Sequence, residues 1–257
     1  MFLKTAALLA LLGYADASYK SGEIKTREQF LYGKFVAKIK APNQFGTCTS
    51  FFTYFNGPKW SPEKWNELDF EIVPSVRDHP VSTNIIFGDG MFRRESHTYV
   101  DGLNPADEWH VYMIEWTPDY IRWSIDGREV RANSKFDPAV KLIKKRQSLM
   151  MNFWTPQFPQ WREGFNDASM PWAALYDFVE VYTWNKKTRM FDLHWRDDFD
   201  YLDLSRWEPS DNFGFTDNTT TFFASQVFVQ QGNLVLQMSK ASTQMNDAEA
   251  PQMRYLQ

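Results

Sequence analysis

The sequence is poor in the features that hold many secreted or membrane-bound proteins together. Its 257 residues include a single cysteine, Cys48, so no disulfide can form within one chain. No run after the N-terminal region approaches the roughly 18 apolar residues that a membrane-spanning helix needs. The net charge is only −4, without the basic excess that a nucleic-acid or anionic-membrane surface requires. A packed core must therefore supply most of the stability, and we expect neither nucleic acid nor membrane as a partner.

Helical periodicity is also nearly absent, which leaves β-strands as the main element. Short segments alternate between apolar and polar residues, as half-buried strands do. Asp126-Gly127 lies between two such segments and is typical of a two-residue hairpin turn, and Gln231-Gly232 separates another pair. Many strands with regular turn signals predict an all-β sandwich or jelly roll. The predicted strands cover residues 34–40, 109–116, 121–125, 128–130, 148–154, 173–184, 226–230 and 233–238.

The first residues have the pattern of a secretory signal peptide. Lys4 precedes an apolar stretch over residues 5–12, and Ala15-Asp16-Ala17 is a small-x-small cleavage site. We therefore expect residues 1–17 to be removed and the protein to be secreted and extracellular. The remainder is predicted to form one domain over residues 18–240, because the strands after residue 190 are too few to bury a core of their own. Residues 185–190 are expected to form a surface connection, and residues 241–257 a poorly ordered tail.

Three carboxylates alternate with three apolar residues between Glu67 and Ile72. On a β-strand, Glu67, Asp69 and Glu71 would line one face, and the apolar residues would enter the core from the other. Like charges this close together repel and do not stabilise a fold, so the arrangement indicates a catalytic role. Paired carboxylates on either side of a sugar bond are the usual apparatus of glycoside hydrolysis. The alternative is an ordinary solvated face of an antiparallel sheet.

The spacing of these acids along the strand permits a catalytic pair. The Cα atoms of Glu67 and Glu71 would lie about 13 Å apart, at about 3.3 Å per residue. A retaining glycosidase needs its two carboxyl groups about 5–5.5 Å apart, so strand curvature and flexible side chains must close most of the gap. Asp69 lies between them, and its charge would push their pKa values apart. Trp60 and Trp65 precede the acids, as expected for the wall of a sugar-binding cleft.

The segment Trp65-Asn66-Glu67-Leu68-Asp69-Phe70-Glu71 resembles the active-site strand of family 16 glycoside hydrolases. Other segments match the same family along most of the chain, namely residues 32–35, 50–54, 110–112, 115–127, 151–154 and 176–179. The resemblance implies a concanavalin-like β-sandwich jelly roll that cleaves β-glucans with retention of configuration.

The order of the matching segments is unusual. Residues 198–207 and 232–236 resemble the segments that normally open the family's domain, but here they close it. The chain therefore resembles the circularly permuted 1,3-1,4-β-glucanases (lichenases) of this family, with residues 185–189 joining the former ends. Circular permutation is tolerated where the ends of a domain lie close together at its surface.

The resemblance also assigns roles to individual residues. Glu67 would be the nucleophile, Glu71 the general acid and then base, and Asp69 the residue that holds a hydrogen bond to the nucleophile. The positions that would contact glucosyl units are Phe52, Tyr54, Asn56, Trp65, Asn84, Asn152, Trp154, Trp161 and Phe213. Core packing is the alternative for the aromatic members of this set.

Catalysis of this kind needs no cofactor, but the resemblance implies a structural calcium ion. Asp177 matches a calcium position of the family, and the main-chain oxygens of Asp198 and Gly232 are the expected co-ligands. The alternative for Asp177 is an ordinary carboxylate at a sheet edge. Cys48 is interpreted as a small buried residue, because no histidine partner is recognisable near it.

We expect a monomeric endo-acting enzyme whose substrate is mixed-linkage β-1,3-1,4-glucan. Within the same family, the alternative is a xyloglucan hydrolase or transglycosylase, which the continuation Ile72-Val73-Pro74 slightly favours. A glucan-binding lectin is the alternative from another functional class, since a fold alone does not determine function. The three crowded acids argue against a lectin, which has no use for them.

Overall fold

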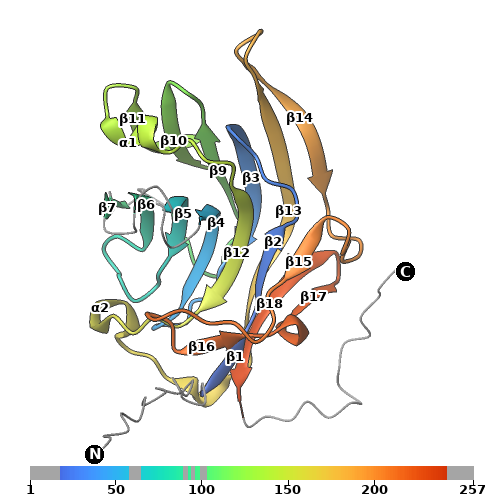
Figure 1. The fold of residues 1–257 in the computed structure, drawn as a ribbon. Helices are drawn as coiled ribbons and strands as arrows, with labels where there is room; N and C mark the ends of the chain where they lie inside the picture. Colours follow the sequence, from blue (N-terminus) through green and yellow to red (C-terminus); the bar gives the residue numbers. More distant parts are fainter. Residues whose placement is uncertain (1–17, 58–64, 89–91, 94–95, 99–102, 242–257) are drawn as a thin grey trace, which may run out of the picture.

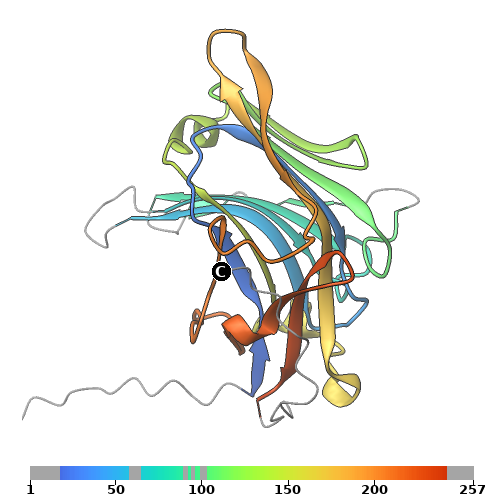
Figure 2. The same cartoon turned by 90° about the vertical axis from the view of Figure 1, so that its right-hand side faces the viewer.

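The computed structural model describes residues 18–57, 65–88, 92–93, 96–98 and 103–241. The expected signal peptide, Trp60 and nearly all of the expected tail lie outside these residues. Within them, two curved β-sheets pack face to face (Figures 1 and 2), which confirms the predicted all-β jelly-roll sandwich. None of the described helices is long and apolar enough to cross a membrane.

The larger sheet has ten strands in the described part of the chain. Its central order is β11-β10-β9-β3-β13-β18-β1-β16, with β14 paired to β13 and β17 paired to β18. Its strands are β1 (Tyr19–Ser21), β3 (Gly33–Lys40), β9 (His110–Trp116), β10 (Tyr120–Ile125), β11 (Arg128–Ser134), β13 (Trp172–Asn185), β14 (Met190–Asp197), β16 (Thr220–Phe222), β17 (Val227–Gln230) and β18 (Asn233–Lys240).

The smaller sheet has eight described strands and carries the acids predicted to be catalytic. Its order is β15-β2-β12-β4-β5-β6-β7, with β8 paired to β6. Its strands are β2 (Glu23–Thr26), β4 (Cys48–Asn56), β5 (Trp65–Ile72), β6 (Val81–Gly88), β7 (Phe92–Arg93), β8 (Ser96–Thr98), β12 (Ser148–Trp154) and β15 (Trp207–Pro209). The short helices are α1 (Pro138–Leu142), α2 (Pro159–Arg162), η1 (Asp167–Ser169) and η2 (Ala224–Gln226).

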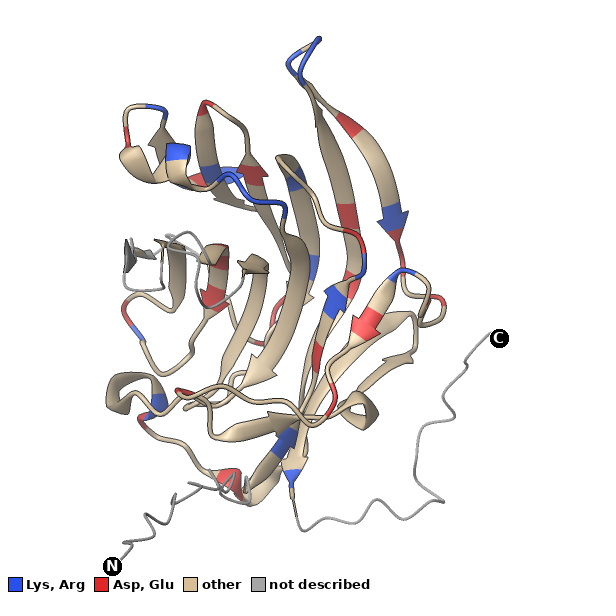
Figure 3. Cartoon of the chain, in the orientation of Figure 1, with Lys and Arg blue, Asp and Glu red and all other residues tan. Residues whose placement is uncertain are grey.

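The predicted turns form as expected. Asp126 and Gly127 join β10 to β11 with φ angles of 49° and 75°, the left-handed pair that a type I′ hairpin requires. Gln231 and Gly232 join β17 to β18 in the same way, with φ angles of 53° and 73°. Within the predicted surface connection, residues 186–189 form the turn between β13 and β14, a hairpin that projects beyond the sandwich and carries Lys and Arg at its tip (Figures 1 and 3).

Strands from the C-terminal part of the chain complete both sheets. β18 pairs with β13 and β1 in the larger sheet, and β15 pairs with β2 in the smaller one. The described strands after residue 190 therefore pair within the same two sheets as the strands before it. The two described ends also meet, because the main-chain N–H of Ala241 donates a hydrogen bond of 2.9 Å to the carbonyl of Ser18.

The core lies between the sheets and is rich in aromatic residues. The largest fully buried side chains include Trp116, Trp123 and Tyr112 from the larger sheet and Phe51 and Phe70 from the smaller one. Phe70 and Tyr112 meet edge to face across the interface, with ring centroids 5.3 Å apart. Much of the high aromatic content therefore serves the core, as the packing alternative expected.

Candidate active site

β5 carries its acids on the face turned away from the core. Leu68 and Phe70 are fully buried in the core between the sheets, whereas Glu67 and Glu71 are half-buried on the opposite face. Asp69 lies between them and is 4% exposed. The predicted alternation is therefore confirmed. We call this side of the eight-stranded sheet, which carries Glu67, Asp69 and Glu71, the acidic face; Figure 3 shows red segments on β5.

Strand pairing sets each acid in a row of side chains that crosses the sheet. β4 and β6 flank β5 on either side, and their registers are continuous along the strand. The rows are Glu67 between Tyr54 and Ile86, Asp69 between Phe52 and Asn84, and Glu71 between Ser50 and Ser82. β12 extends the rows beyond β4, so that Met150 stands opposite Phe52 and Asn152 opposite Ser50.

Two hydrogen bonds through the core hold the backbone beneath the acids. The indole Nε1 of Trp123, on β10, donates to the carbonyl of Asp69 at 2.9 Å. The hydroxyl of Tyr176, on β13, donates to the carbonyl of Ser50 at 2.8 Å. Both donors belong to the larger sheet and are buried, so neither bond competes with water. The larger sheet thus fixes the positions of β4 and β5 relative to the core, and with them the backbone beneath the acidic face.

The structure gathers most of the predicted substrate contacts on this face. Phe52, Asn84, Asn152 and Trp154 are buried there, each between 4% and 7% exposed. Tyr54 and Trp65 are half-buried beside Glu67, with ring centroids 5.9 Å apart, and Asn56 is exposed at the end of β4. Their rows follow directly from the alternation of the strands.

Two predicted contacts come from outside the sheet. Trp161 is 8% exposed on α2, with its ring centroid 6.3 Å from that of Trp154. Phe213 follows β15 and is 49% exposed, and its ring stacks on Phe222 at 6.4 Å. Among the described residues, the rings of Phe222, Phe215 and Trp154 connect Phe213 to the acidic face.

Burial and the acids set the protonation of their neighbours. Burial, reinforced by the charge of Glu67, raises the pKa of Tyr54 to about 12, so this phenol keeps its proton at neutral pH. The Nε1 of Trp65 donates a hydrogen bond to Oε2 of Glu67. Burial also raises the pKa of the Cys48 thiol well above its usual range, and the nearby charge of Glu71 adds to that shift. Cys48 is fully buried, as predicted, and is held in the unreactive thiol form.

Two buried amide oxygens on the acidic face lack a hydrogen-bond partner among the described residues. These are Oδ1 of Asn84, beside Asp69, and Oδ1 of Asn152, beside Ser50. An unsatisfied buried acceptor costs about 1–3 kcal/mol, which a hydroxyl donor from a bound molecule could recover. The two amides therefore offer acceptors to a hydroxyl-rich ligand such as a sugar.

One further acid of this face, Glu23, was not among the predicted site residues. It stands opposite Asn152 at the strand next to β12, is 3% exposed, and accepts a hydrogen bond of 2.7 Å from Oγ of Ser210. Burial raises the pKa of its carboxyl group above the ordinary value of 4.5. The alternation of residues 23–26 could have indicated a strand. Only the pairing of β2 with β12, which joins residues 129 positions apart, brings Glu23 to the acids.

The positions predicted for calcium lie close in the strand pairing of the larger sheet. Asp177 lies on β13 at the point where the neighbouring strand changes. On one side of Asp177, Tyr176 pairs with Leu234 of β18. On the other side, Val179 pairs with Asp197 of β14. Its carboxylate makes an ion pair of 2.8 Å with Nζ of Lys38. Asp198 follows β14, and Gly232 precedes β18. Among the described residues, no three His, Cys, Asp or Glu side chains gather as metal ligands, so main-chain oxygens would have to supply most of such a site.

The sequence is similar to known glycoside hydrolases. The family model of glycosyl hydrolases family 16 matches residues 5–174. A beta-glucanase of Fibrobacter succinogenes is 30% identical over 253 residues, which are 96% of this chain and 71% of that protein. A beta-glucanase of Brevibacillus brevis is 29% identical over 163 residues, which are 63% of this chain and 60% of that protein.

Solved structures share the fold. The Crh5 transglycosylase superposes with a TM-score of 0.52 at 24% identity, covering 66% of this chain and 76% of that one. A family 16 endo-glucanase from Bacteroides ovatus gives a TM-score of 0.51 at 15% identity, covering 62% and 79%. With the family model matching about two thirds of the sequence, including the whole of β5, this chain belongs to glycosyl hydrolase family 16.

Proposed function

We propose that this protein is a secreted endo-β-glucanase that hydrolyses mixed-linkage β-1,3-1,4-glucan with retention of configuration. One observation carries the proposal: Glu67, Asp69 and Glu71 share one face of β5, outside the core, in rows with aromatic and amide side chains. Membership of family 16, with relatives named beta-glucanases, supports hydrolysis of a β-glucan. The mixed linkage and the retaining mechanism are the more specific parts of the proposal, and the product analysis described below tests them.

The proposed mechanism has two steps. Glu67 attacks the anomeric carbon and forms a glycosyl-enzyme ester, while Glu71 gives its proton to the departing glycosidic oxygen. Glu71 then removes a proton from water, which attacks the anomeric carbon and releases Glu67 as a carboxylate. Asp69 lies between the two and holds a hydrogen bond to the nucleophile. The open oxygens of Asn84 and Asn152 accept hydroxyl protons of bound glucosyl units.

Product analysis with the purified mature chain tests this function. After incubation with barley β-glucan, mass spectrometry should detect short oligosaccharides, and NMR should show the β-anomer first at each new reducing end. Parallel incubations with xyloglucan and laminarin separate the alternatives. Activity on xyloglucan alone would assign the chain to the xyloglucan-active branch, and binding without cleavage of any glucan would indicate a lectin.

We also propose that the chain is circularly permuted relative to most of its family. The alignment with the Fibrobacter beta-glucanase spans 96% of the chain, whereas that with the Brevibacillus enzyme spans 63%. The adjacency of Ser18 and Ala241 makes the reverse rearrangement feasible. A variant with these two residues joined by a short linker, and opened between Lys187 and Thr188, should fold and keep its activity. Failure to fold would count against the permutation.

We also propose that the protein is exported, is a monomer and binds a structural calcium ion. N-terminal sequencing of protein from the culture medium should begin at Ser18 if the signal peptide is cleaved as we expect. Light scattering should show a monomer. Asp177, with main-chain oxygens of Asp198 and Gly232, would hold a calcium ion that ties β13, β14 and β18 together, and Lys38 would have to release Asp177.

A further inference from the structure

A continuous strip of aromatic rings leads from the acidic face onto α2. It begins at Trp154, the last residue of β12, whose Nε1 donates to Oγ of Ser50 at 3.1 Å. Trp161 lies next, with its ring centroid 6.3 Å from that of Trp154. Phe158 ends the strip and meets Trp161 edge to face, with centroids 5.8 Å apart and an interplanar angle of 85°. Because Ser50 stands opposite Glu71, the strip is continuous with the row of Glu71.

The outer end of this strip faces solvent and is firmly held. Phe158 is 36% exposed, against 8% for Trp161. Its carbonyl accepts hydrogen bonds from the main-chain N–H groups of Trp161 and Arg162, at 3.1 and 2.9 Å. The guanidinium of Arg162 in turn donates to the hydroxyls of Thr155 and Thr219, at 3.1 and 2.8 Å. A partly exposed ring on a hydrogen-bonded backbone offers a stacking surface at little cost in backbone entropy.

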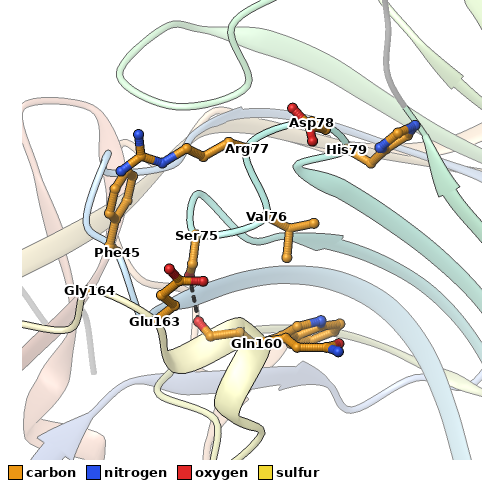
Figure 4. Close-up of a pocket in the computed structure, with 10 residues that line it drawn as sticks. Phe45, Ser75, Val76, Arg77, Asp78, His79, Gln160, Glu163 and Gly164 are labelled. Atoms are coloured by element: carbon orange, nitrogen blue, oxygen red, sulfur yellow. Dashed lines mark hydrogen bonds between the residues drawn. The ribbon is translucent and has the colours of Figure 1, made fainter.

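A cavity of about 660 Å³ adjoins Trp161 (Figure 4). Arg77, Asp78, Gln160 and Glu163 line it, and the guanidinium of Arg77 lies over the ring of Phe45, 4.8 Å from its centroid. These side chains combine hydrogen-bond donors and acceptors and charges of both signs. Such a lining suits a neutral, hydroxyl-rich ligand better than an anion or a cation.

We propose that Phe158 and Trp161, together with the polar side chains of this cavity, form a distal carbohydrate-binding subsite. It would hold glucosyl units of the polysaccharide beyond those that contact Glu67 and Glu71. The apolar C–H face of one glucosyl unit would pack on the exposed ring of Phe158. The hydroxyls of another unit, in the cavity beside Trp161, would meet Arg77 and Glu163. The inference rests on the proposed function, because the glucan is the molecule that the acidic face would deliver to this strip.

The test compares Phe158→Ala with Phe136→Ala. Phe136 is 85% exposed in the segment between β11 and α1, and Figure 1 shows α1 at the upper left of the molecule and α2 at the lower left. The KM for barley β-glucan should rise roughly two- to tenfold in Phe158→Ala, with kcat unchanged, since one aromatic contact is worth about 0.5–1.5 kcal/mol. The KM for an aryl glycoside of a glucan disaccharide should not change. Phe158→Trp, which keeps a ring, should behave as the wild type.

Native electrophoresis in gels containing barley β-glucan measures binding without catalysis. If the wild type cleaves no glucan, the proposed function is wrong. The proposed subsite is then tested by the binding assay alone, because that assay needs no cleavage. Weaker retardation of Phe158→Ala than of Phe136→Ala supports the subsite. Equal retardation of the two variants, no retardation of the wild type, or an equal KM for the polymer would overturn it.

Discussion

Nδ2 of Asn152 donates a hydrogen bond of 3.0 Å to Oε2 of Glu23, linking two buried side chains that lie 129 residues apart in the sequence. The pair extends the row of Glu71 and Ser50 across β12 to β2. Oγ of Ser210 donates to the other oxygen of Glu23, so this carboxylate has partners on both oxygens and still has a raised pKa. Loss of hydration upon burial outweighs the two donors.

Because the pKa of Glu23 is raised in the folded state, we expect this residue to lower the free energy of unfolding as the pH rises. Below the unfolded pKa of about 4.5, both states hold the proton, so titration of this group does not change the free energy of unfolding. Above it, the folded state keeps the proton longer, so stability declines as the pH rises from about 4.5 through the folded pKa. Glu23→Gln should match the wild type near pH 4 and melt at a higher temperature near pH 7. Thermal melts across this range, with the exposed Glu163→Gln as control, measure the difference. Parallel curves for wild type and Glu23→Gln would contradict the prediction.

Loss of the proposed nucleophile should abolish turnover in a way that a small anion can repair. Glu67→Ala should lower kcat on barley β-glucan by about 10⁴-fold or more, because no glycosyl-enzyme can form. Azide fits the space left by the side chain, attacks the anomeric carbon and should yield a glycosyl azide, detectable by mass spectrometry. Glu71→Ala is the matched variant, and azide should give a different, β-configured product there if Glu71 is the acid/base. Absence of rescue in Glu67→Ala would assign the nucleophile elsewhere.

Asp69 should matter less than either glutamate. Asp69→Asn keeps the shape and removes the charge, so kcat should fall by roughly 10–100-fold, the worth of one charge-assisted hydrogen bond. Its backbone should stay in place, because Trp123 binds the carbonyl of Asp69 and not its side chain. Steady-state kinetics on the same glucan, beside Glu67→Gln, provide the comparison. A loss equal to that of Glu67→Gln would give Asp69 a direct catalytic role.

Calcium should stabilise the fold without taking part in the reaction. Chelation with EDTA should lower the melting temperature, because a bound ion stabilises only the folded state that holds it. Asp177→Asn should lower it to a similar degree and make it insensitive to EDTA. Elemental analysis of the untreated protein checks for the ion, and Asp192→Asn, on β14, serves as control. An unchanged melting temperature in protein shown to lack calcium would remove the site.

Much of this protein could be predicted from local sequence patterns. Alternation between Glu67 and Ile72 determined which side of β5 enters the core, because side chains on a strand alternate between its faces. Asp126-Gly127 and Gln231-Gly232 determined two hairpins, because few other residues accept left-handed backbone conformations in succession. The run of strands and turn signals predicted an all-β sandwich or jelly roll, and the family resemblance specified a concanavalin-like one. For the faces of β5 and for the two hairpins, the information lies within a few consecutive residues.

The tertiary structure alone decided which distant residues share the acidic face. Glu23 joins it because β2 pairs with β12. Phe215 meets Trp154 directly, whereas Phe158 meets Trp161, whose ring in turn lies beside that of Trp154. Trp123 and Tyr176 fix the strands from beneath by bonds that cross the core. The sequence by itself determined the faces of the strands, since those depend on local alternation. Which distant residues share a face depends on strand order and register. These arise from long-range packing that no local pattern encodes.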